Sequence, residues 1–506
     1  MRVNIGNWVT KAAIKTPYKL AIINKNSTFS YQWIENMSNY FANDLVNKYN
    51  VKPGDRIALM FPNNIHFIVA YYAVLKVGAT CVPIHHLLKN KEVKYILKHS
   101  ESRLLISEKT ILNVKPNVGD FPYLEHVIVS VSLCEDNLFE PFMMFKISNQ
   151  SNISKLHVSK SEEDVAIIFY TSGTSGTPKG VMLTHENIFS KMNPLKQAIK
   201  FSSEDKMLSG LPMVHVYGQI MAMNFVVWCN ATLILLEDEN ESCIVWGLEN
   251  QGATVMMSTP TVYYRLNCYL KNNNKSINHN LRFAITGGSP SSSQLKREYE
   301  QYFKVQLLDS YGLTETSATI IMEHPDGYHR KPGSIGRSLS NHDVQILDES
   351  GIELPPGQVG EIAVRSKTVM KRYFKDDILQ AQSSKNGWFL TGDIGYQDIG
   401  GNFFLIDRRK DIIQTMGFVV SPSEIEEVLL EHSKIQETAV VGIPDEEKGE
   451  VIKAYIVVRL GQNLSEQEVF VYLKEHLANF KCPSLIEFVD NLPRNNSGKL
   501  LKRLLK

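Results

Sequence analysis

The sequence predicts an α/β protein. We expect a large N-terminal domain of helix-covered, mainly parallel sheets with a small β-barrel-like subdomain, followed by a small α+β domain. Three observations predict this class. Short apolar, β-branched runs alternate with stretches of helical period through most of the chain. After about residue 330 turns alone separate the apolar runs, and the last hundred residues form a short helix and strand pattern of their own. A length of 506 residues allows about three domain-sized units.

The alternation of strand and helix is clearest in the first hundred residues. Residues 56–61 are an apolar run that predicts a buried strand, residues 66–77 predict a helix that Gly78 ends, and residues 79–84 predict the next strand. The same order returns at three later strands, 253–257, 282–286 and 305–308. Parallel neighbours need a crossover, which is usually a helix, so this order predicts parallel sheets covered by helices.

The chain after about residue 330 follows a different pattern. Strands are expected at 344–347, 360–365 and 402–406, and turns such as 348–351 and 398–401 separate them. Turns of this kind connect neighbouring antiparallel strands, so we expect an antiparallel sheet or a small barrel here.

The last hundred residues predict a separate α+β unit, with helix 423–432, strands 437–443 and 451–458, and helix 465–476. A charged string, Asp-Arg-Arg-Lys-Asp at 407–411, stands between two apolar segments just before it. A charged run is usually a solvated turn, but this one is also the best candidate for a boundary. We expect a large domain 1–406, a hinge 407–411 and a small domain 412–506.

The composition disfavours several classes of protein. The net charge is +1, whereas a dedicated nucleic-acid binder usually carries a basic excess. The six cysteines are scattered without metal-ligand spacing, which indicates a reducing compartment. The start of the chain lacks the apolar core of a signal peptide, and polar residues interrupt the most apolar window, 220–236, so it is better explained as core than as a membrane span. We expect a cytoplasmic enzyme without integral membrane association.

The segment 170–180, Tyr-Thr-Ser-Gly-Thr-Ser-Gly-Thr-Pro-Lys-Gly, is the most informative motif. It lies between the apolar run 165–169 and a helical segment that begins at about Glu186. Bare backbone amides, several hydroxyls and one ammonium group suit a polyphosphate. The segment is not a Walker A loop, because Pro178 stands where that motif needs Gly and Gly180 follows the lysine. A flexible linker is the alternative, but linkers rarely separate a buried strand from a helix.

Four further segments place polar residues in turns. They are Asp-Ser-Tyr-Gly-Leu-Thr-Glu-Thr at 309–316, Gly-Trp-Phe-Leu-Thr-Gly-Asp at 387–393, Asp407-Arg408, and Leu-Pro-Arg-Asn-Asn-Ser-Gly-Lys at 492–499. A turn at a strand end can place an aromatic face for a base and a carboxylate for Mg²⁺. Each segment alone is weak evidence, since an isolated glutamate or lysine is usually just solvated.

In this order and at these separations, the motifs resemble the adenylate-forming superfamily of acyl-CoA synthetases, peptide-synthetase adenylation domains and beetle luciferases. The resemblance covers essentially the whole chain and is nearest to the acyl- and aryl-CoA synthetases. It implies that a carboxylic acid attacks ATP to give an acyl-adenylate and pyrophosphate, and that a thiol then displaces AMP. ATP and Mg²⁺ are the implied cofactors, with CoA as the expected thiol.

The resemblance also implies roles for individual residues. Lys499 would bridge the acyl carboxylate and the phosphate, Glu315 would hold Mg²⁺, and Thr314 would touch the α-phosphate. Asp393 would bind the ribose hydroxyls with Arg408 as second partner. The β- and γ-phosphates would be wrapped by Thr171, Ser172, Gly173, Thr174, Ser175, Gly176 and Thr177, with Lys179 nearby. The nucleotide would also be bordered by Gly288, Ser289, Pro290, Asp309, Ser310 and Tyr311, with Gly312 and Thr316 from the same segment.

Members of this superfamily swing their small C-terminal domain between the two half-reactions. The matching hinge residue here is Lys410, and the loop around Gly417 would then reach the thiol tunnel while Lys499 withdraws. Closure of this kind excludes water from a reactive intermediate.

His215 matches a histidine that members acting on fatty or aryl acids place near the substrate carboxylate. A lone histidine is usually a satisfied core residue, but the motif favours a substrate-shaping role. Residues 216–227 contain no acidic side chain, which argues against an α-amino acid substrate. Nearby apolar residues suit an aliphatic or aromatic acid, although they could equally be core: Met221, Met223, Phe225, Val226, Trp228, Met257, Tyr263 and Tyr264.

Three hypotheses for the function therefore remain. The first is an acyl-CoA synthetase for a fatty or aryl acid. The second transfers the acyl group to a carrier protein that acts in trans. The third, a catalytically inactive nucleotide-binding protein, is disfavoured because the charged motif residues are intact. Two departures stand out: Gln414 and Met416 follow the hinge where luciferases and aryl-CoA ligases often carry lysines, and Arg372-Tyr373 replaces a common Gly-Tyr, without a consequence visible in the sequence.

Overall fold

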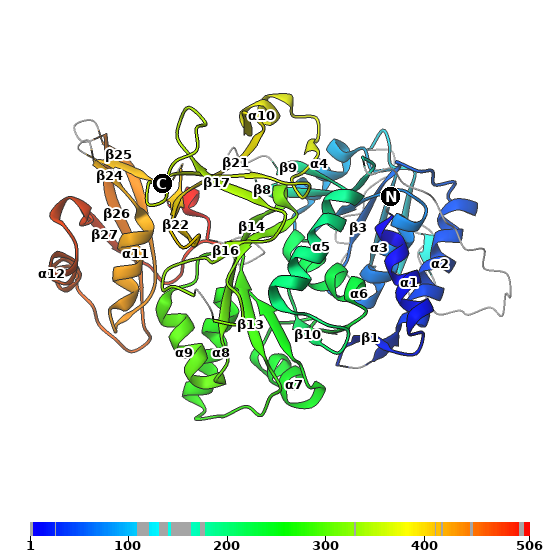
Figure 1. The fold of residues 1–506 in the computed structure, drawn as a ribbon, viewed down its shortest axis with the longest axis horizontal. Coiled ribbons are helices and arrows are strands. Elements are labelled where there is room, and N and C mark those ends of the chain that lie inside the picture. The colour runs from blue at the N-terminus through cyan, green and yellow to red at the C-terminus, as the bar shows by residue number, and fades with distance from the viewer. Residues whose placement is uncertain are drawn as a thin grey trace.

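The computed structural model describes most of the chain: residues 4–25, 27–108, 121–130, 140–142, 163–172, 178–327, 330–409, 411–415, 418–445, 449–494 and 500–505. Its strands form four sheets. In Figure 1 the C-terminal elements, coloured orange to red, occupy one end of the molecule, and the blue N-terminal elements lie toward the other.

The largest sheet has nine strands in the order β16-β15-β14-β13-β12-β10-β11-β1-β2. Its six central strands run parallel, and β2, β15 and β16 add antiparallel edges. The strands are β1 (Leu20–Ile23), β2 (Thr28–Ser30), β10 (Lys206–Ser209), β11 (Thr232–Leu235), β12 (Val255–Ser258), β13 (Phe283–Gly287), β14 (Leu307–Leu313), β15 (Ala318–Met322) and β16 (Arg337–Ser338).

The second sheet has eight strands in the order β19-β9-β8-β4-β3-β5-β6-β7. It is parallel from β8 to β7, while β9 and β19 pair antiparallel at one edge. The strands are β3 (Arg56–Met60), β4 (Thr80–Pro83), β5 (Leu104–Glu108), β6 (His126–Ser130), β7 (Glu140–Phe142), β8 (Val165–Ser172), β9 (Pro178–Thr184) and β19 (Arg372–Tyr373).

Helices cover both faces of the two large sheets, as the alternation predicts. They are α1 (Trp8–Lys15), α2 (Tyr31–Asn47), α3 (Ile65–Lys76), α4 (Asn90–Ser100), α5 (His185–Ile199), the π-helix η4 (Tyr217–Asn224), α6 (Phe225–Cys229), α7 (Glu241–Gln251), α8 (Pro260–Asn272), α9 (Ser293–Phe303) and α10 (Asp377–Gln382). One hydrophobic core joins the two sheets through α1, α2, α3, α5 and η4. Alternate strand residues face separate cores: Phe283 and Ile285 face this shared core, while Ala284 packs with α7, α8 and α9.

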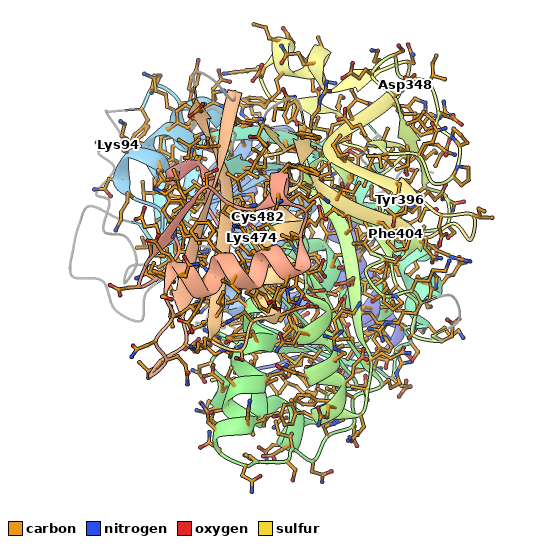
Figure 2. All side chains as sticks on the ribbon, turned by 90° about the vertical axis from the view of Figure 1, so that its left-hand side faces the viewer. Lys94, Asp348, Tyr396, Phe404, Lys474 and Cys482 are labelled. Atoms are coloured by element: carbon orange, nitrogen blue, oxygen red, sulfur yellow. The ribbon has the colours of Figure 1, made fainter. Side chains whose placement is uncertain are left out.

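The strands after residue 340 form a five-stranded antiparallel sheet, as expected. They are β17 (Asp343–Leu347), β18 (Gly360–Arg365), β20 (Ser384–Lys385), β21 (Trp388–Gln397) and β22 (Phe403–Arg408). Their order is β17-β18-β21-β20, and β22 pairs with β21. Figure 2 shows Tyr396 beside Phe404 on the β21–β22 pair, with their rings stacked 4.7 Å apart.

The C-terminal unit contains β23 (Ile413–Thr415), β24 (Phe418–Val420), α11 (Pro422–Glu431), β25 (Ile435–Asp445), β26 (Gly449–Val458), α12 (Glu466–His476) and β27 (Leu485–Phe488). It has two hydrophobic clusters of its own, to which only residues from 413 onward contribute. It touches the rest of the molecule at α8, where Arg459 Nη1 lies 3.5 Å from the hydroxyl of Tyr264.

A strand that the sequence did not predict overlaps the end of the segment 170–180. Pro178–Thr184 forms β9, which pairs antiparallel with β8, and the helix expected from about Glu186 follows as α5, which begins at His185. The two described ends of the motif, 170–172 and 178–180, therefore lie on paired antiparallel strands, and Thr171 faces Lys179 across the pair.

The apolar window 220–236 lies in the core. Most of it forms η4, α6 and β11, and most of its apolar residues contribute to the shared core, while Ile234 and Leu236 pack in the cluster with α7, α8 and α9. Among the described residues, none of the helices combines the length and apolar character that a bilayer crossing needs.

Candidate active site

A short strap of residues 370–374 joins the β8–β9 hairpin to the end of β14. The amide of Met370 donates to the carbonyl of Glu315 at 2.7 Å, and the amide of Phe374 donates to the carbonyl of Gly180 at 2.7 Å. Between them, Tyr373 pairs with Val181 of β9. The predicted phosphate motif and the predicted Mg²⁺ ligand therefore lie on opposite sides of one strap.

Glu315 lies in the 3₁₀ turn η5 (Thr314–Thr316), directly after β14. The hydroxyl of Tyr373 donates to Glu315 Oε1 at 2.9 Å. Within the described part of the chain, no hydrogen bond or ion pair reaches Glu315 Oε2. Lys179 Nζ lies 5.6 Å from the centre of the Tyr373 ring and also has no acidic partner within this part. One free carboxylate oxygen and one free ammonium group flank the same tyrosine.

Asp393 forms the second half of the site. The hydroxyl of Tyr311 donates to Asp393 Oδ2 at 2.6 Å, and Arg408 Nε lies 3.1 Å from Oδ1. The register of β21 and β22 places Asp393 opposite Arg408. Burial, and to a lesser extent Asp393, raises the pKa of Tyr311, so its hydroxyl stays a donor. The structure thus brings together three residues that the sequence assigns to the nucleoside.

An ion pair and several hydrogen bonds fix the positions of Asp309 and Ser310. Asp309 Oδ2 pairs with Lys296 Nζ at 2.7 Å, and its amide donates to Glu323 Oε2 at 2.9 Å. Burial is the main cause that raises the pKa of Asp309. Ser310 Oγ donates to the carbonyl of Thr286 and meets the hydroxyl of Tyr217 at 3.0 Å. The Asp309 carboxylate is therefore engaged in an ion network with Lys296 and Glu323.

The remaining residues of this segment shape the turn. Thr316 is buried, and its hydroxyl donates to the carbonyls of Leu313 and Ala318. A Cβ on Gly312 would lie 2.1 Å from the carbonyl oxygen of Ala318, so only glycine fits there. The Thr314 hydroxyl makes no hydrogen bond within the described residues and is free for a ligand.

The turn after β13 is open. Gly288 has a φ of +83°, which favours glycine, and no atom lies within 4 Å of where a Cβ would stand. Ser289 is half-buried and Pro290 is exposed. In parallel sheets ligands bind at the carboxyl ends of the strands, and this turn is such an end.

His215 stands in a row of three histidines. Its ring lies 5.3 Å from that of His85, which stacks on His86 at 5.0 Å. Burial lowers the pKa of His215 to about 4, and burial followed by His215 and His86 lowers that of His85 to about 3. His215 Nε2 is buried without a hydrogen-bond partner among the described residues. The row is neutral at physiological pH.

The expected apolar wall belongs largely to the core. Met221, Met223, Phe225 and Val226 are fully buried in the shared core, and Tyr263 donates to the carbonyl of Ile285. Met221 and Met223 lie on η4, a π-helix, which is a rare form that often occurs at functional sites.

Several predicted residues lie outside the described residues: Gly173, Thr174, Ser175, Gly176, Thr177, Lys410, Gly417 and Lys499. The backbone of Ser172 is described as the last residue of β8.

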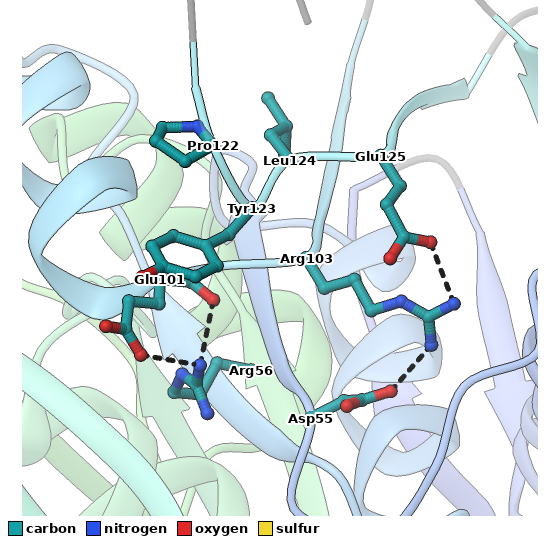
Figure 3. Close-up of a pocket in the computed structure, with 8 residues that line it drawn as sticks. All are labelled: Asp55, Arg56, Glu101, Arg103, Pro122, Tyr123, Leu124 and Glu125. Atoms are coloured by element: carbon teal, nitrogen blue, oxygen red, sulfur yellow. Dashed lines mark hydrogen bonds and ion pairs between the residues drawn. The ribbon is translucent and has the colours of Figure 1, made fainter.

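A hollow elsewhere on the molecule contains none of these residues. Figure 3 shows Arg103 between Asp55 and Glu125, and Arg56 beside Glu101. The ion-pair distances are 2.7 Å for Arg103–Asp55, 2.8 Å for Arg103–Glu125 and 3.0 Å for Arg56–Glu101. Each arginine already has a carboxylate partner, so the hollow presents no unpaired positive charge to an anion.

The comparison with protein-family models decides the family. The model of the AMP-binding enzyme matches residues 9–374, and that of the AMP-binding enzyme C-terminal domain matches residues 424–499. The chain belongs to the AMP-binding enzyme family. This membership confirms the predicted superfamily and, together with curated relatives that are CoA ligases, the expected class of AMP-forming acid–thiol ligase.

Two curated relatives span almost the whole of this AMP-binding enzyme. A 2-succinylbenzoate–CoA ligase of Bacillus licheniformis is 31% identical, with 99% of each chain covered. A crotonobetaine/carnitine–CoA ligase of Escherichia coli O157:H7 is 33% identical, with 97% of this chain and 96% of the relative covered.

Among solved structures, ATP-bound MatB from Rhodopseudomonas palustris superposes with a TM-score of 0.90 at 28% identity, covering 100% of this chain and 98% of MatB. The apo form of the same protein gives a TM-score of 0.78 over the same coverage. The arrangement of this AMP-binding enzyme is therefore nearer to the ATP-bound form of MatB than to its apo form.

The residues present fit ATP and a divalent cation. Among the described residues, Glu315 offers a carboxylate oxygen without a partner, Lys179 an ammonium group without an acidic partner, and the turn at Gly288 an open strand end. Carboxylate oxygens are ligands that Mg²⁺ prefers, and ammonium groups stabilise phosphates.

Sequence reasoning missed the residues that support this site. In the sequence Tyr373 stands out only beside Arg372, which departs from a family motif. No sequence pattern indicates Lys296 and Glu323, because the ion network joins distant parts of the chain. His85 and His86 were not predicted either, although two adjacent histidines after an apolar strand are an unusual pattern that could have indicated a site.

Proposed function

We propose that this enzyme joins a fatty or aryl acid to CoA through an acyl-adenylate. In the first half-reaction the acid attacks the α-phosphate of ATP and pyrophosphate leaves, and in the second the thiol of CoA displaces AMP. A carrier-protein phosphopantetheine is the alternative acceptor. The curated relatives are named for different acids, so the acid must be decided on this enzyme itself.

The observation that carries this proposal is the convergence of two charged groups on the β14–η5 segment. Tyr311 donates to Asp393, which pairs with Arg408. Four residues later Glu315 accepts from Tyr373, whose ring lies 5.6 Å from Lys179 Nζ. The first group suits the ribose, and the second suits the phosphates. The segment thus has the chemistry to bind both ends of ATP.

The chain's own residues would act mainly through charge. Lys179 and the amides and hydroxyls of 171–177 would hold the phosphates where negative charge accumulates in the transition state. Glu315 would hold Mg²⁺, which neutralises charge on the departing pyrophosphate when it is bound. Lys499 would pair the acyl carboxylate with the α-phosphate, a task that suits a flexible point charge. Thr314, next to Glu315 in the chain and without a side-chain hydrogen bond to any described residue, would contact a phosphate.

The surroundings of His215 support the proposal that the acyl group of the substrate is uncharged. A neutral, buried imidazole next to His85 offers no charge to pair with an ammonium group, and residues 216–227 contain no acid. The apolar side chains of η4 are core and do not add to this argument. A fatty or aryl acid is the substrate class that remains.

We also propose that the C-terminal unit, 412–506, rotates about 407–411 at Lys410 between the half-reactions and exchanges Lys499 for the loop at Gly417. The separate hydrophobic clusters of this unit support the proposal, because it can move without opening another core. The likeness to ATP-bound MatB suits an arrangement for the first half-reaction.

ATP–pyrophosphate exchange across a panel of fatty, aryl and amino acids tests the first half-reaction. We expect exchange with a fatty or aryl acid and none with amino acids. Mass spectrometry of the product formed with CoA, or with a holo-carrier protein, separates the two acceptors. Absence of exchange with every acid would reject the enzymatic proposal.

A further inference from the structure

Tyr373 lies between the two charged groups of the phosphate side of the site. Its hydroxyl donates to Glu315 Oε1 at 2.9 Å, and Lys179 Nζ lies 5.6 Å from its ring centre. The side chain is 5% exposed. A single buried phenol therefore contacts both the carboxylate and the ammonium group through different parts of its ring system.

The backbone of Tyr373 is fixed on both sides. It pairs with Val181 in β9, and its amide donates to the side-chain oxygen of Gln380 at 3.0 Å. The neighbouring amides of Met370 and Phe374 tie the strap to Glu315 and Gly180. The hydroxyl is thus presented to Glu315 from a rigid position.

The hydrogen bond has a specific effect on Glu315. It occupies Oε1 and leaves Oε2 without a partner among the described residues. Partners that orient a carboxylate ligand tune metal affinity, although they do not touch the metal.

We propose that Tyr373 is a positioning residue that orients Glu315 toward the divalent cation and supports Lys179 through its ring. This inference rests on the proposed function and deepens it. It gives a role to Tyr373, for which the sequence alone offers none. Arg372 itself pairs with the exposed Asp377, outside this contact.

The test is cation binding rather than activity. Binding of Mn²⁺ in the presence of a non-hydrolysable ATP analogue is followed by electron paramagnetic resonance on the intact enzyme. Tyr373→Phe removes only the hydroxyl, and we expect its Mn²⁺ affinity to fall about tenfold, the usual effect of losing a ligand's supporting partner. Binding of the analogue without metal should stay unchanged, because the ring under Lys179 remains.

Tyr31→Phe is the matched control. The Tyr31 hydroxyl is also buried and donates to the carbonyl of Ala231 at 2.6 Å, but it lies in the shared core, and among the described residues its hydrogen bonds go to backbone carbonyls and not to Glu315, Lys179 or Tyr373. Its loss should lower stability without changing Mn²⁺ affinity. Tyr373→Leu, which removes the ring as well, should also weaken the metal-free analogue about threefold, as expected for a lost cation–π contact.

A double-mutant comparison shows whether the effect passes through Glu315. In a Glu315→Gln background, Tyr373→Phe should have no further effect on Mn²⁺ affinity, because the carboxylate it orients is gone. An equal loss in both backgrounds would overturn the proposal, and so would a normal Mn²⁺ affinity for Tyr373→Phe. If the unchanged enzyme binds neither the analogue nor Mn²⁺, both the proposed function and the Tyr373 inference fail. If the unchanged enzyme binds both and Tyr373→Phe binds Mn²⁺ equally well, only the Tyr373 inference fails.

Discussion

The hydroxyl of Tyr311 donates a 2.6 Å hydrogen bond to Asp393, although 82 positions separate the two residues. Tyr311 belongs to the nine-stranded sheet and Asp393 to the antiparallel sheet, so this bond joins two sheets at the candidate site. Asp393 is 2% exposed, and Arg408 meets its other oxygen. A buried carboxylate of this kind depends on both partners.

Tyr311→Phe should therefore impair both stability and nucleotide binding. Loss of a hydrogen bond to a buried carboxylate costs about 2 kcal/mol, which urea unfolding would detect. The KM for ATP in pyrophosphate exchange should also rise. Tyr396→Phe is the control, since Tyr396 lies on the same strand as Asp393 and stacks on Phe404 (Figure 2). Equal effects of the two variants on the KM would contradict a nucleotide role for Tyr311.

Lys499→Ala should separate the half-reactions. If this lysine neutralises charge only during adenylation, pyrophosphate exchange should collapse, while thioester formation from supplied acyl-adenylate should largely survive. Lys474→Ala, at an exposed position on α12, is the control and should leave both rates unchanged (Figure 2). Equal loss of both steps in Lys499→Ala would argue against rotation of the C-terminal unit.

Asp407→Ala should shift the balance between the half-reactions. Asp407 Oδ2 accepts hydrogen bonds from the amide and hydroxyl of Ser423, at the first turn of α11 beyond the proposed hinge. Loss of such a cap costs about 1 kcal/mol, and a cost of this size corresponds to about a fivefold change in a conformational equilibrium. We expect slower adenylation relative to thioester formation in single-turnover measurements.

Asp348→Ala provides the comparison for Asp407. Asp348 caps an exposed turn of the antiparallel sheet by accepting from the amide of Ile352 at 2.9 Å, away from the hinge (Figure 2). Its loss should leave the ratio of the two rates unchanged. The same ratio in both variants would show that the Asp407 contact has no part in the rotation.

Acid should destabilise the enzyme through the histidine row. Burial holds the pKa of His85 at about 3, whereas an unfolded histidine titrates near pH 6.5. Below about pH 6.5 the unfolded chain binds a proton that the folded chain refuses, so the free energy of unfolding falls until about pH 3. One group contributes a slope of up to about 1.4 kcal/mol per pH unit in this window.

His85→Asn should remove that contribution while its side-chain oxygen can still accept from the amide of Leu87, as His85 Nδ1 does at 3.2 Å. Urea unfolding at several pH values should show a shallower loss of stability between pH 6.5 and 3 than in the unchanged enzyme. His476→Asn, at an exposed position on α12, is the control. Identical slopes in all three proteins would refute the assignment.

Most elements of the fold could be predicted because local periodicity and burial agree. The strand expected at 360–365 is β18 itself, and the helix expected at 66–77 is α3 within one residue at each end. β9 was missed because Pro178 and Gly180 are poor strand formers, and its pairing with β8 overrides their local preference. The π-helix was missed because its apolar pattern does not differ from that of an ordinary buried helix.

The candidate site also contains some residues that could be predicted from the sequence and others that could not. Residues carried by contiguous motifs, such as Glu315 and Asp393, could be predicted because the motif itself is local. Their supports could not, because Tyr373 meets Glu315 across 58 positions and Lys296 meets Glu323 across 27. Only the pairing of distant strands brings such partners together, and a single sequence does not show that pairing.

The contact of Asp407 with Ser423 has a consequence for the timing of catalysis. If the C-terminal unit rotates about Lys410, the first turn of α11 must release its cap at every turnover and regain it before the next ATP is used. The rate at which the Asp407–Ser423 contact breaks and re-forms would then help to set the duration of each half-reaction, because it would determine how long the C-terminal unit stays in each arrangement. Turnover could in that case be tuned by residues that touch neither the acid nor the nucleotide.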